Sequence, residues 1–236
     1  MKFINKKIAA AMIALLLATL ACSSTNPGSD AVPTSGPDII PPSPVPSAVS
    51  AGPLYQDSFS NRHQDWGTGT DEQSSVEYLN DGLHMAVYQS KYITWSTPGM
   101  EMFENTHLSV KVVNNSTDPT AFFGFVCNEL GTTSSFYYVG VSPDGYYAFI
   151  KSAVAQDDVY LKEGNSDVIA ATQGNMNLSM DCGNGSLALY VNDQKIDSVN
   201  DTTYQKGAIG LFAASNDIES GVDVTFDDFV VTKLGE

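Results

Sequence analysis

Short strand-like runs follow one another along almost the whole chain after residue 53. Each run is rich in Val, Ile, Phe, Tyr and Thr and is bounded by Gly, Asn, Asp or Pro, as in β-strands joined by turns. No stretch keeps the 3.6-residue apolar period of a helix over three turns. The pattern predicts strands at residues 75–79, 83–89, 92–96, 106–114, 120–127, 136–141, 146–151, 158–162, 176–181, 186–191, 195–199, 207–213 and 221–232.

Turn residues between these runs indicate hairpins. Asn80-Asp81-Gly82, Pro143-Asp144-Gly145 and Asn192-Asp193 each separate two apolar runs and favour tight antiparallel turns. So many short strands do not fit in one open sheet, whereas two packed sheets bury one face of each. We therefore predict an all-β fold, a jelly-roll-like sandwich of two antiparallel sheets.

The first 21 residues have the features of an export signal. Three lysines precede the apolar run from Ile8 to Leu20, which is shorter than the ~20 residues that span a bilayer. "LATLAC" then places Cys22 directly after Ala21, and this resembles a bacterial lipoprotein signal in which the cysteine is lipidated. We expect a lipid anchor at Cys22 in a bacterial cell envelope, facing outside the cytoplasm. The alternative is a plain secretory peptide followed by an unpaired cysteine.

Residues 22–53 are rich in Pro and Ser and nearly devoid of large apolar side chains, so we expect a disordered tether. Residues 54–236 remain for one domain, a size that suits a single core. The whole chain has a net charge of −16, and without the three signal lysines the remainder is at −19. Such a surface repels phosphate backbones, so we expect no nucleic-acid partner and interpret the charge as a means of solubility.

Two cysteines remain besides Cys22, and both lie at the end of a strand-like run. In an exported protein the pair Cys127 and Cys182 favours a disulfide, which we expect between neighbouring strands. The alternative is a metal-binding or catalytic thiol, for which neither position has a histidine or second cysteine close in sequence.

Several motifs together resemble the concanavalin A-like lectin/glucanase sandwiches over residues 55–233. They are "YQDSFSN", "YITWSTPG", "FYYVGVSPDGYYAF", "LSMDCGNGSLALYVNDQKI", "GAIGLFA" and "VDVTFDDFVV". The likeness is to laminin-G-like and keto-disaccharide-hydrolase-like modules carried on bacterial lipoproteins. The resemblance implies that the two cysteines lie in adjacent strands. It also implies a structural calcium ion where the first and last strands meet, on Asp57, Asp227 and Asp228, although these aspartates would also suit turn caps or solvent. We expect no other cofactor.

Catalytic patterns are weak in this chain. A retaining glycosidase needs two carboxyls ~5 Å apart. The nearest approximations are Asp71-Glu72 with Glu77, and Asp217 with Glu219. Both lie in loop-like sequence without the alternating strand frame. His63, His84 and His107 fall in different elements, and no serine lies in a nucleophile elbow. We therefore assign no catalytic residue.

The hairpin at residues 135–149 is the best candidate for a ligand surface. Strand alternation sends Tyr137, Val139, Val141, Tyr147 and Phe149 to the core, and it sends Phe136, Tyr138, Gly140, Ser142, Tyr146 and Ala148 to the opposite face. Exposed aromatic rings stack on sugar rings. We predict Tyr138 and Tyr146 as a platform, with a shallow gap between them at Gly140 and Ala148.

The two tryptophans divide between packing and binding. Trp66 is expected to pack in the core, and Trp95 is a further ligand candidate. The function expected from these features is a membrane-anchored, extracytoplasmic, non-catalytic binding module for glycans or another surface polymer. The alternatives are a glycoside- or keto-sugar-hydrolysing enzyme with an atypical site, or a protein-binding adhesion module.

Overall fold

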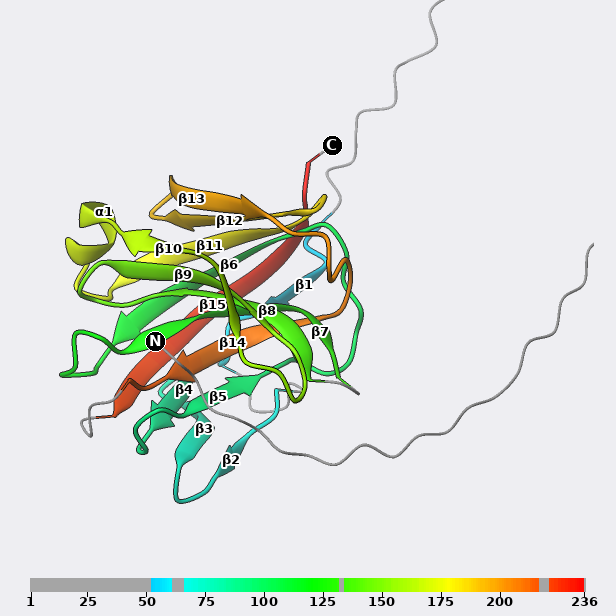
Figure 1. Ribbon diagram of the computed structural model, residues 1–236. Helices are drawn as coiled ribbons and strands as arrows, with labels where there is room; N and C mark the ends of the chain where they lie inside the picture. Colours follow the sequence, from blue (N-terminus) through cyan, green and yellow to red (C-terminus); the bar gives the residue numbers. More distant parts are fainter. Residues whose placement is uncertain (1–51, 61–65, 132–133, 217–220, 236) are drawn as a thin grey trace, which may run out of the picture. The chain divides into compact units, whose positions relative to one another are not determined.

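A computed structural model describes residues 52–60, 66–131, 134–216 and 221–235 (Figure 1). The predicted signal peptide and nearly all of the tether, with Cys22, lie outside these residues. One sheet comprises β1 (Tyr55–Asp57), β2 (Gly69–Thr70), β3 (Ser74–Leu79), β4 (Gly82–Val87), β6 (Thr106–Asn114), β11 (Met176–Gly183), β12 (Ser186–Val191), β13 (Gln194–Asn200) and β15 (Val222–Lys233). The other comprises β5 (Ile93–Ser96), β7 (Phe122–Leu130), β8 (Ser135–Val141), β9 (Tyr146–Ser152), β10 (Val159–Asn165) and β14 (Ala208–Ala214).

The two sheets form the predicted all-β sandwich. The nine-stranded sheet has the order β13-β12-β11-β6-β15-β4-β3-β2, with β1 paired to β15, and the six-stranded sheet has the order β10-β9-β8-β7-β14-β5. Neighbours in both sheets run antiparallel, for example β6 with β15 and β8 with β9. Every predicted run overlaps a strand, whereas the sequence pattern does not predict the short β1 and β2.

The helix α1 (Asp167–Ala170) is also not predicted, because a segment of 4 residues shows no apolar period. Ser166 caps it by accepting a hydrogen bond from the Val168 amide at 3.2 Å. In the described part of the chain no helix has the length and apolar character that a membrane span requires.

The main core lies between the sheets and takes alternate residues from each strand. Tyr137, Val139, Val141, Tyr147 and Phe149 all belong to it, which confirms the predicted inward face of the hairpin. The predicted register also holds, with Val139 opposite Phe149 and Val141 opposite Tyr147.

Trp66 packs in this core, as predicted, with 4% of its surface exposed. Its ring makes edge-to-face contacts with Phe59 and Phe229 at centroid distances of 5.3 and 5.2 Å. The indole N–H donates to the Tyr55 hydroxyl at 3.1 Å, so the buried polar group is satisfied.

The disulfide between Cys127 and Cys182 is present, but it does not join neighbouring strands of one sheet. Cys127 belongs to β7 of the six-stranded sheet and Cys182 to β11 of the nine-stranded sheet, with a Cα–Cα distance of 6.7 Å. Both sulfurs are buried. The expectation of adjacent strands is therefore wrong, since sequence alone does not say which strands face each other across the core.

Two polar bridges join the sheets close to the edge strands β10 and β13. Asp197 of β13 accepts from the Tyr147 hydroxyl at 2.7 Å and from Lys162 Nζ at 2.6 Å. Four residues on, Asp201 accepts from the Tyr137 hydroxyl at 2.5 Å and from Lys151 Nζ at 2.9 Å. Each aspartate thus ties a tyrosine and a lysine of the six-stranded sheet to the chain of β13.

The bridges set the pKa values of their members. Burial by itself would raise the pKa of Asp201, but hydrogen bonds from Lys151, Thr203 and Tyr137 hold it well below its usual range. The pKa of Asp197 is lowered in the same way, the bonds from Lys162 and Tyr147 outweighing burial. Burial, followed by the hydrogen bond to its aspartate, raises the pKa of both Tyr137 and Tyr147 to about 12.

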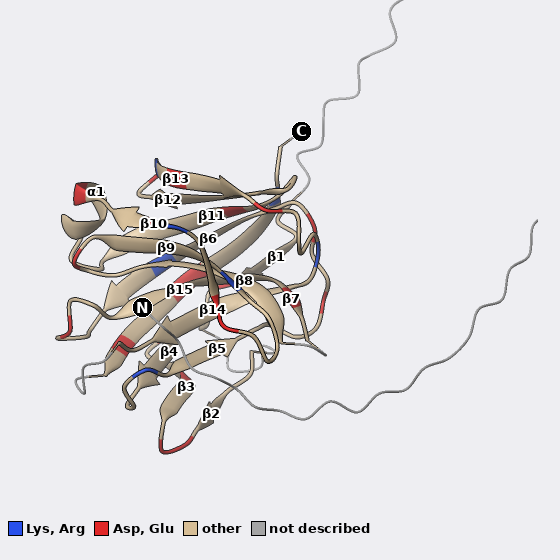
Figure 2. Ribbon diagram, viewed as in Figure 1, with Lys and Arg blue, Asp and Glu red and all other residues tan. Residues whose placement is uncertain are grey.

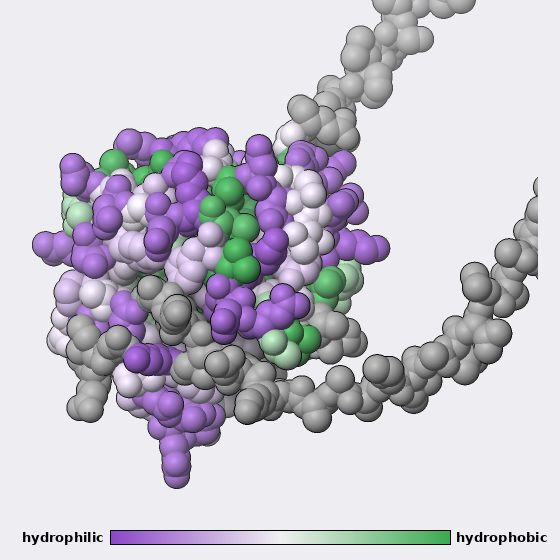
Figure 3. Space-filling model, in the orientation of Figure 1, coloured by the Kyte–Doolittle hydropathy of each residue, from purple (hydrophilic) through white to green (hydrophobic). Residues whose placement is uncertain are grey.

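Charged residues are spread over the surface of the domain. Acidic residues are scattered over several strands and loops, and basic ones are fewer (Figure 2). The face shown in Figure 3 is mostly hydrophilic and carries a narrow hydrophobic strip. This distribution fits the interpretation of the net charge as a means of solubility.

Candidate functional site

The outer face of the six-stranded sheet, turned away from the other sheet, carries a second apolar cluster. All of its members come from strands of this sheet, so the cluster is separate from the main core. Its buried members are Phe122, Val126, Phe136, Tyr138, Ala148, Ile150, Phe212 and Ala214, and its partly buried ones are Ile93, Trp95, Tyr146 and Tyr160. The face predicted for ligand binding is therefore this outer face, and all three predicted ligand residues lie on it.

Tyr138 lies at the centre of this face and is almost completely enclosed, with 1% of its surface exposed. Its hydroxyl donates to Asp158 at 2.6 Å, and its ring meets the Phe212 ring edge-on at a centroid distance of 5.4 Å. Burial, with the Asp158 charge adding to it, raises the pKa of the hydroxyl far above its usual range. Tyr138 therefore forms the floor of the face, beneath more exposed groups.

The shallow gap expected at Gly140 does not exist. A Cβ placed on Gly140 would come within 2.7 Å of Cζ of Phe212, so the Phe212 ring already fills that space. Gly124, Gly140 and Ala148 lie opposite one another across three strands and make room for it. The sequence does not reveal this, because Phe212 lies on β14, more than 60 residues away from Gly140 along the chain.

Tyr146 and Tyr160 form the partly exposed rim of the face beside two carboxylates. The Tyr146 hydroxyl donates to Glu163 at 2.6 Å. Tyr160 stands opposite Ile150 in the next strand, and Glu163 stands opposite Ala148, so both point to the outer face. We call Tyr138, Tyr146, Tyr160, Asp158 and Glu163 the tyrosine strip.

The Tyr160 hydroxyl is buried and has no hydrogen-bond partner among the described residues. Burial raises its pKa, and the nearby charges of Asp158 and Glu163 raise it further. A buried hydroxyl without a partner costs about 1–3 kcal/mol, so this atom is the least satisfied polar group of the strip. Beside the strip lies a depression of about 230 Å³, lined by Thr120, Ser142, Asp144, Tyr146, Glu163, Asn165 and Asn216.

Trp95 lies at the far edge of the same face, on β5, with β8, β7 and β14 between it and β9. Its indole N–H donates to Glu129 at 3.3 Å, and its ring lies 5.3 Å from the Phe136 ring. Burial raises the pKa of Glu129, and the indole hydrogen bond opposes this shift. Trp95 thus shares a face with the tyrosine strip but belongs to another part of it.

The aspartates predicted for calcium have protein partners. Asp57 accepts from the Phe59 amide at 2.7 Å, Asp227 accepts from the Asp228 amide at 2.7 Å, and Asp228 pairs with Lys111 at 2.5 Å. Burial raises the pKa of Asp57. No group of three His, Cys, Asp or Glu side chains within the described ranges is arranged to hold a metal. These contacts fit the alternative of turn capping, and a calcium ion here stays a prediction.

The residues considered for catalysis do not come together in one site within the described part of the chain. His84 Nε2 lies 2.9 Å from Asp223 and His107 Nδ1 lies 2.7 Å from Asp181, both pairs on strands of the nine-stranded sheet. Glu77 lies beside His84, with 3.8 Å between Oε1 and Nδ1. His63, Asp217 and Glu219 lie outside the described residues.

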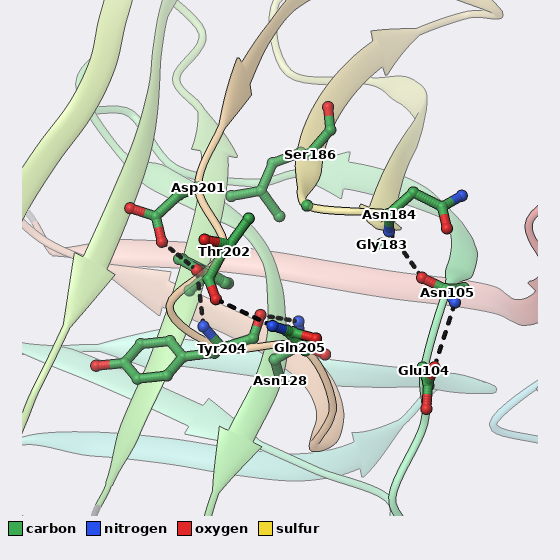
Figure 4. Close-up of a pocket in the computed structure, with 13 residues that line it drawn as sticks. Glu104, Asn105, Asn128, Gly183, Asn184, Ser186, Asp201, Thr202, Tyr204 and Gln205 are labelled. Carbon is green, nitrogen blue, oxygen red and sulfur yellow. Dashed lines mark hydrogen bonds between the residues drawn. The ribbon is translucent and has the colours of Figure 1, made fainter.

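A second concavity, which sequence reasoning missed, opens at one end of the sandwich (Figure 4). It has a volume of about 280 Å³, and we call it the end cleft. Five segments of the chain meet there, and the lining residues are Glu104, Asn105, Asn128, Tyr137, Gly183, Asn184, Gly185, Ser186, Leu187, Asp201, Thr202, Tyr204 and Gln205. The sequence signal was limited to turn residues such as "GNGS", which predict a hairpin and not a cleft.

Comparison with known proteins gives a likeness in structure only. No protein-family model matches the sequence, and no curated protein matches it. The carbohydrate-binding module CBM66 of Bacillus subtilis is 11% identical, with a TM-score of 0.57 over 72% of this chain and 96% of the module. A galectin-like protein of unknown function from Bacillus subtilis is 11% identical, with a TM-score of 0.58 over 78% of this chain and 96% of that protein.

The solved structure of an enzyme is also similar to this chain. The β-glucanase of Bacillus licheniformis is 12% identical, with a TM-score of 0.53 over 78% of this chain and 99% of the enzyme. The chain has the concanavalin A-like jelly-roll fold. The fold that the motifs predict is thereby confirmed. Binding modules and enzymes share this jelly roll, so the fold does not choose between them.

Proposed function

We propose that the domain binds a neutral glycan on the outer face of the six-stranded sheet, at the tyrosine strip. The observation that carries this proposal is the combination of partly exposed tyrosine rings and two carboxylates on one face. Sugar rings offer C–H faces to aromatic rings and hydroxyls to carboxylates. The presence of a carbohydrate-binding module and a β-glucanase among the similar structures supports a glycan as the ligand.

The chemistry of the strip favours a neutral sugar. Asp158 and Glu163 accept hydrogen bonds from sugar hydroxyls but repel the carboxylate or sulfate of an acidic sugar. Tyr146 at the rim supplies the stacking surface, and the adjoining depression has room for the neighbouring unit.

A glycan array tests this proposal, followed by calorimetric titration of any neutral hit. We expect Tyr146→Ala to weaken binding by about 5-fold or more, since it removes a contact of about 1 kcal/mol. Tyr190→Phe is the matched control, because its hydroxyl bonds to Asp181 on the nine-stranded sheet, away from the strip. Absence of binding to every neutral glycan, or equal affinity for all variants, would refute the proposal.

The hydrolase remains the second candidate, and one observation favours it. Asp158 and Glu163 both lie on the outer face beside tyrosines of the strip, and a glycosidase likewise places two carboxylates on one face. Each carboxylate, however, accepts a short hydrogen bond from a tyrosine. Incubation of the array hit with the protein, with Glu163→Gln as a control, separates the candidates: cleavage identifies an enzyme, and an intact ligand a binding module. An adhesion module that binds protein would leave the array blank.

We also propose that Cys22 carries a lipid anchor and holds the domain outside the cytoplasm of a bacterial cell. The support is the lysine-rich start, the apolar run and the position of the cysteine. Cys22→Ser should release the protein from the membrane fraction and remove the lipid mass from its N-terminus. An unchanged mass would refute the anchor.

A further inference from the structure

The end cleft is a second place where polar groups converge, and it shares no residue with the tyrosine strip. It is assembled from the residues before β6, the end of β7, Tyr137 of β8, the turn between β11 and β12, and the connection between β13 and β14. Figure 4 shows these segments around a common space, with Thr202 and Gln205 on one side and Asn105 on the other, while the Asn184 side chain points away from Thr202 and Gln205.

The cleft is held rigidly. Asn105, Asn128 and Asn184 all have left-handed backbone conformations, with φ of 52°, 53° and 53°. Asparagine tolerates this region better than most residues, and it places a short amide next to the turn. The Asn105 side chain accepts from the Asn184 amide at 2.7 Å, and Asn128 donates to the Tyr204 carbonyl at 2.9 Å.

A disulfide and close backbone packing also hold the wall of the end cleft in place. The disulfide joins Cys127 and Cys182, each of which directly precedes a residue of the lining. A Cβ on Gly183 would come within 2.4 Å of the Asn105 Cα, so the two segments pack as closely as backbone allows. The cleft is therefore pre-organised, which lowers the entropic cost of binding.

Several donors and acceptors at the cleft remain available to a ligand. Nδ2 of Asn105 makes only a long contact of 3.4 Å with Glu104, and the Gln205 amide only one of 3.5 Å with the Thr202 carbonyl. Amides that both donate and accept match hydroxyl groups, which do the same.

The charge of the cleft excludes anions. Glu104 and Asp201 are its charged lining residues, and Asp201 is neutralised by Lys151 at 2.9 Å. Phosphates, sulfates and uronates would face an uncompensated Glu104. A neutral polyhydroxylated molecule is the class that fits both the amides and the charge.

We propose that the end cleft is a second carbohydrate site, which takes a single neutral sugar unit through Asn105 and Gln205. Because the two sites share no side chain, this proposal stands or falls separately from the proposed function. A protein with both sites would hold a glycan at the tyrosine strip and a second sugar unit at the end of the sandwich.

Hydrogen exchange of the full chain, measured by mass spectrometry, locates the binding. The probes are methyl α-glucoside, methyl α-galactoside and methyl α-mannoside, with methyl α-glucuronoside as the anionic comparison. We expect at least one neutral glycoside to slow exchange in segments 183–186 and 201–205, and the glucuronoside to have no effect there.

Variants test the named residues. Asn105→Gly removes the amide and keeps the left-handed backbone, and Gln205→Ala alters only an exposed side chain. Each should weaken the effect of the glycoside by about 5-fold. Asn80→Gly is the matched control, since Asn80 has a φ of 52° in a turn that does not line the cleft.

The outcomes separate the two proposals. Protection of 183–186 and 201–205 that is lost in both cleft variants supports the second site. Protection confined to 146–163 overturns the second site and supports the tyrosine strip. Protection confined to the cleft segments supports the second site and counts against the strip. No protection by any neutral glycoside, or equal protection in the cleft variants, overturns the second site.

Discussion

Removal of the disulfide should cost this domain a large part of its stability. Cys127 and Cys182 are separated by 55 residues and join the two sheets through the core. In the chain-entropy model a closed loop of this length lowers the entropy of the unfolded chain by about 14 cal/mol/K, which is about 4 kcal/mol at 25 °C. For a domain of this size that corresponds to a fall in melting temperature of about 8–16 °C.

The double variant Cys127→Ala/Cys182→Ala measures this effect. Alanine is preferred to serine because both positions are buried, and a buried hydroxyl would add a cost of its own. Urea unfolding at equilibrium gives the change in free energy, and unfolding of the reduced wild-type protein is the control. We expect the variant and the reduced protein to agree and to lie about 4 kcal/mol below the oxidised protein.

A loss below about 1 kcal/mol would refute the reasoning, because it would mean that the bridge hardly restricts the unfolded chain. The same variant also reports on the end cleft, whose wall includes Asn128 and Gly183, the residues that follow the two cysteines. Below its melting temperature the variant should bind neutral glycosides at the cleft more weakly than the wild type, since pre-organisation is lost.

Three further predictions follow from the polar groups and the packing. Tyr160→Phe removes the buried hydroxyl that lacks a partner among the described residues, so it should stabilise the domain by up to about 1 kcal/mol in urea unfolding. A loss of stability would show that the hydroxyl is satisfied. Asp197 and Asp201 have lowered pKa values when folded, so their stabilising effect is complete above the unfolded pKa of about 4 and is lost as the pH falls toward the folded values. The free energy of unfolding, measured from pH 7 to pH 3, should therefore fall less steeply in Asp201→Asn than in the wild type. Equal slopes of this free energy against pH would contradict the stabilising role of the two bridges. Phe212→Ala empties the space over Gly140 and should lower the free energy of unfolding, measured by calorimetry, by about 3–5 kcal/mol. A decrease below about 1 kcal/mol would mean that the ring is not packed.

The predicted ligand residues illustrate how far local pattern reaches. Alternation places Tyr138 and Tyr146 on the outer face correctly, because successive side chains of a strand always point to opposite faces. It does not show that Tyr138 is covered while Tyr146 is half exposed, since that depends on Phe212 from β14 and on Asp158 from the loop before β10. Tyr160 escaped notice because a missing hydrogen-bond partner is visible only in three dimensions.

The sequence by itself determined the all-β class, the hairpins and the inward face of the hairpin at residues 135–149, because these depend on period, turn residues and side-chain type within a few positions. It also predicted the disulfide between Cys127 and Cys182, which the structure confirms. The tertiary structure decided which strands face each other, and so made the disulfide a link between sheets. It also decided that Phe212 fills the gap at Gly140 and that five segments of the chain form the end cleft. Strand order is set by packing across the whole core, and no local pattern encodes it.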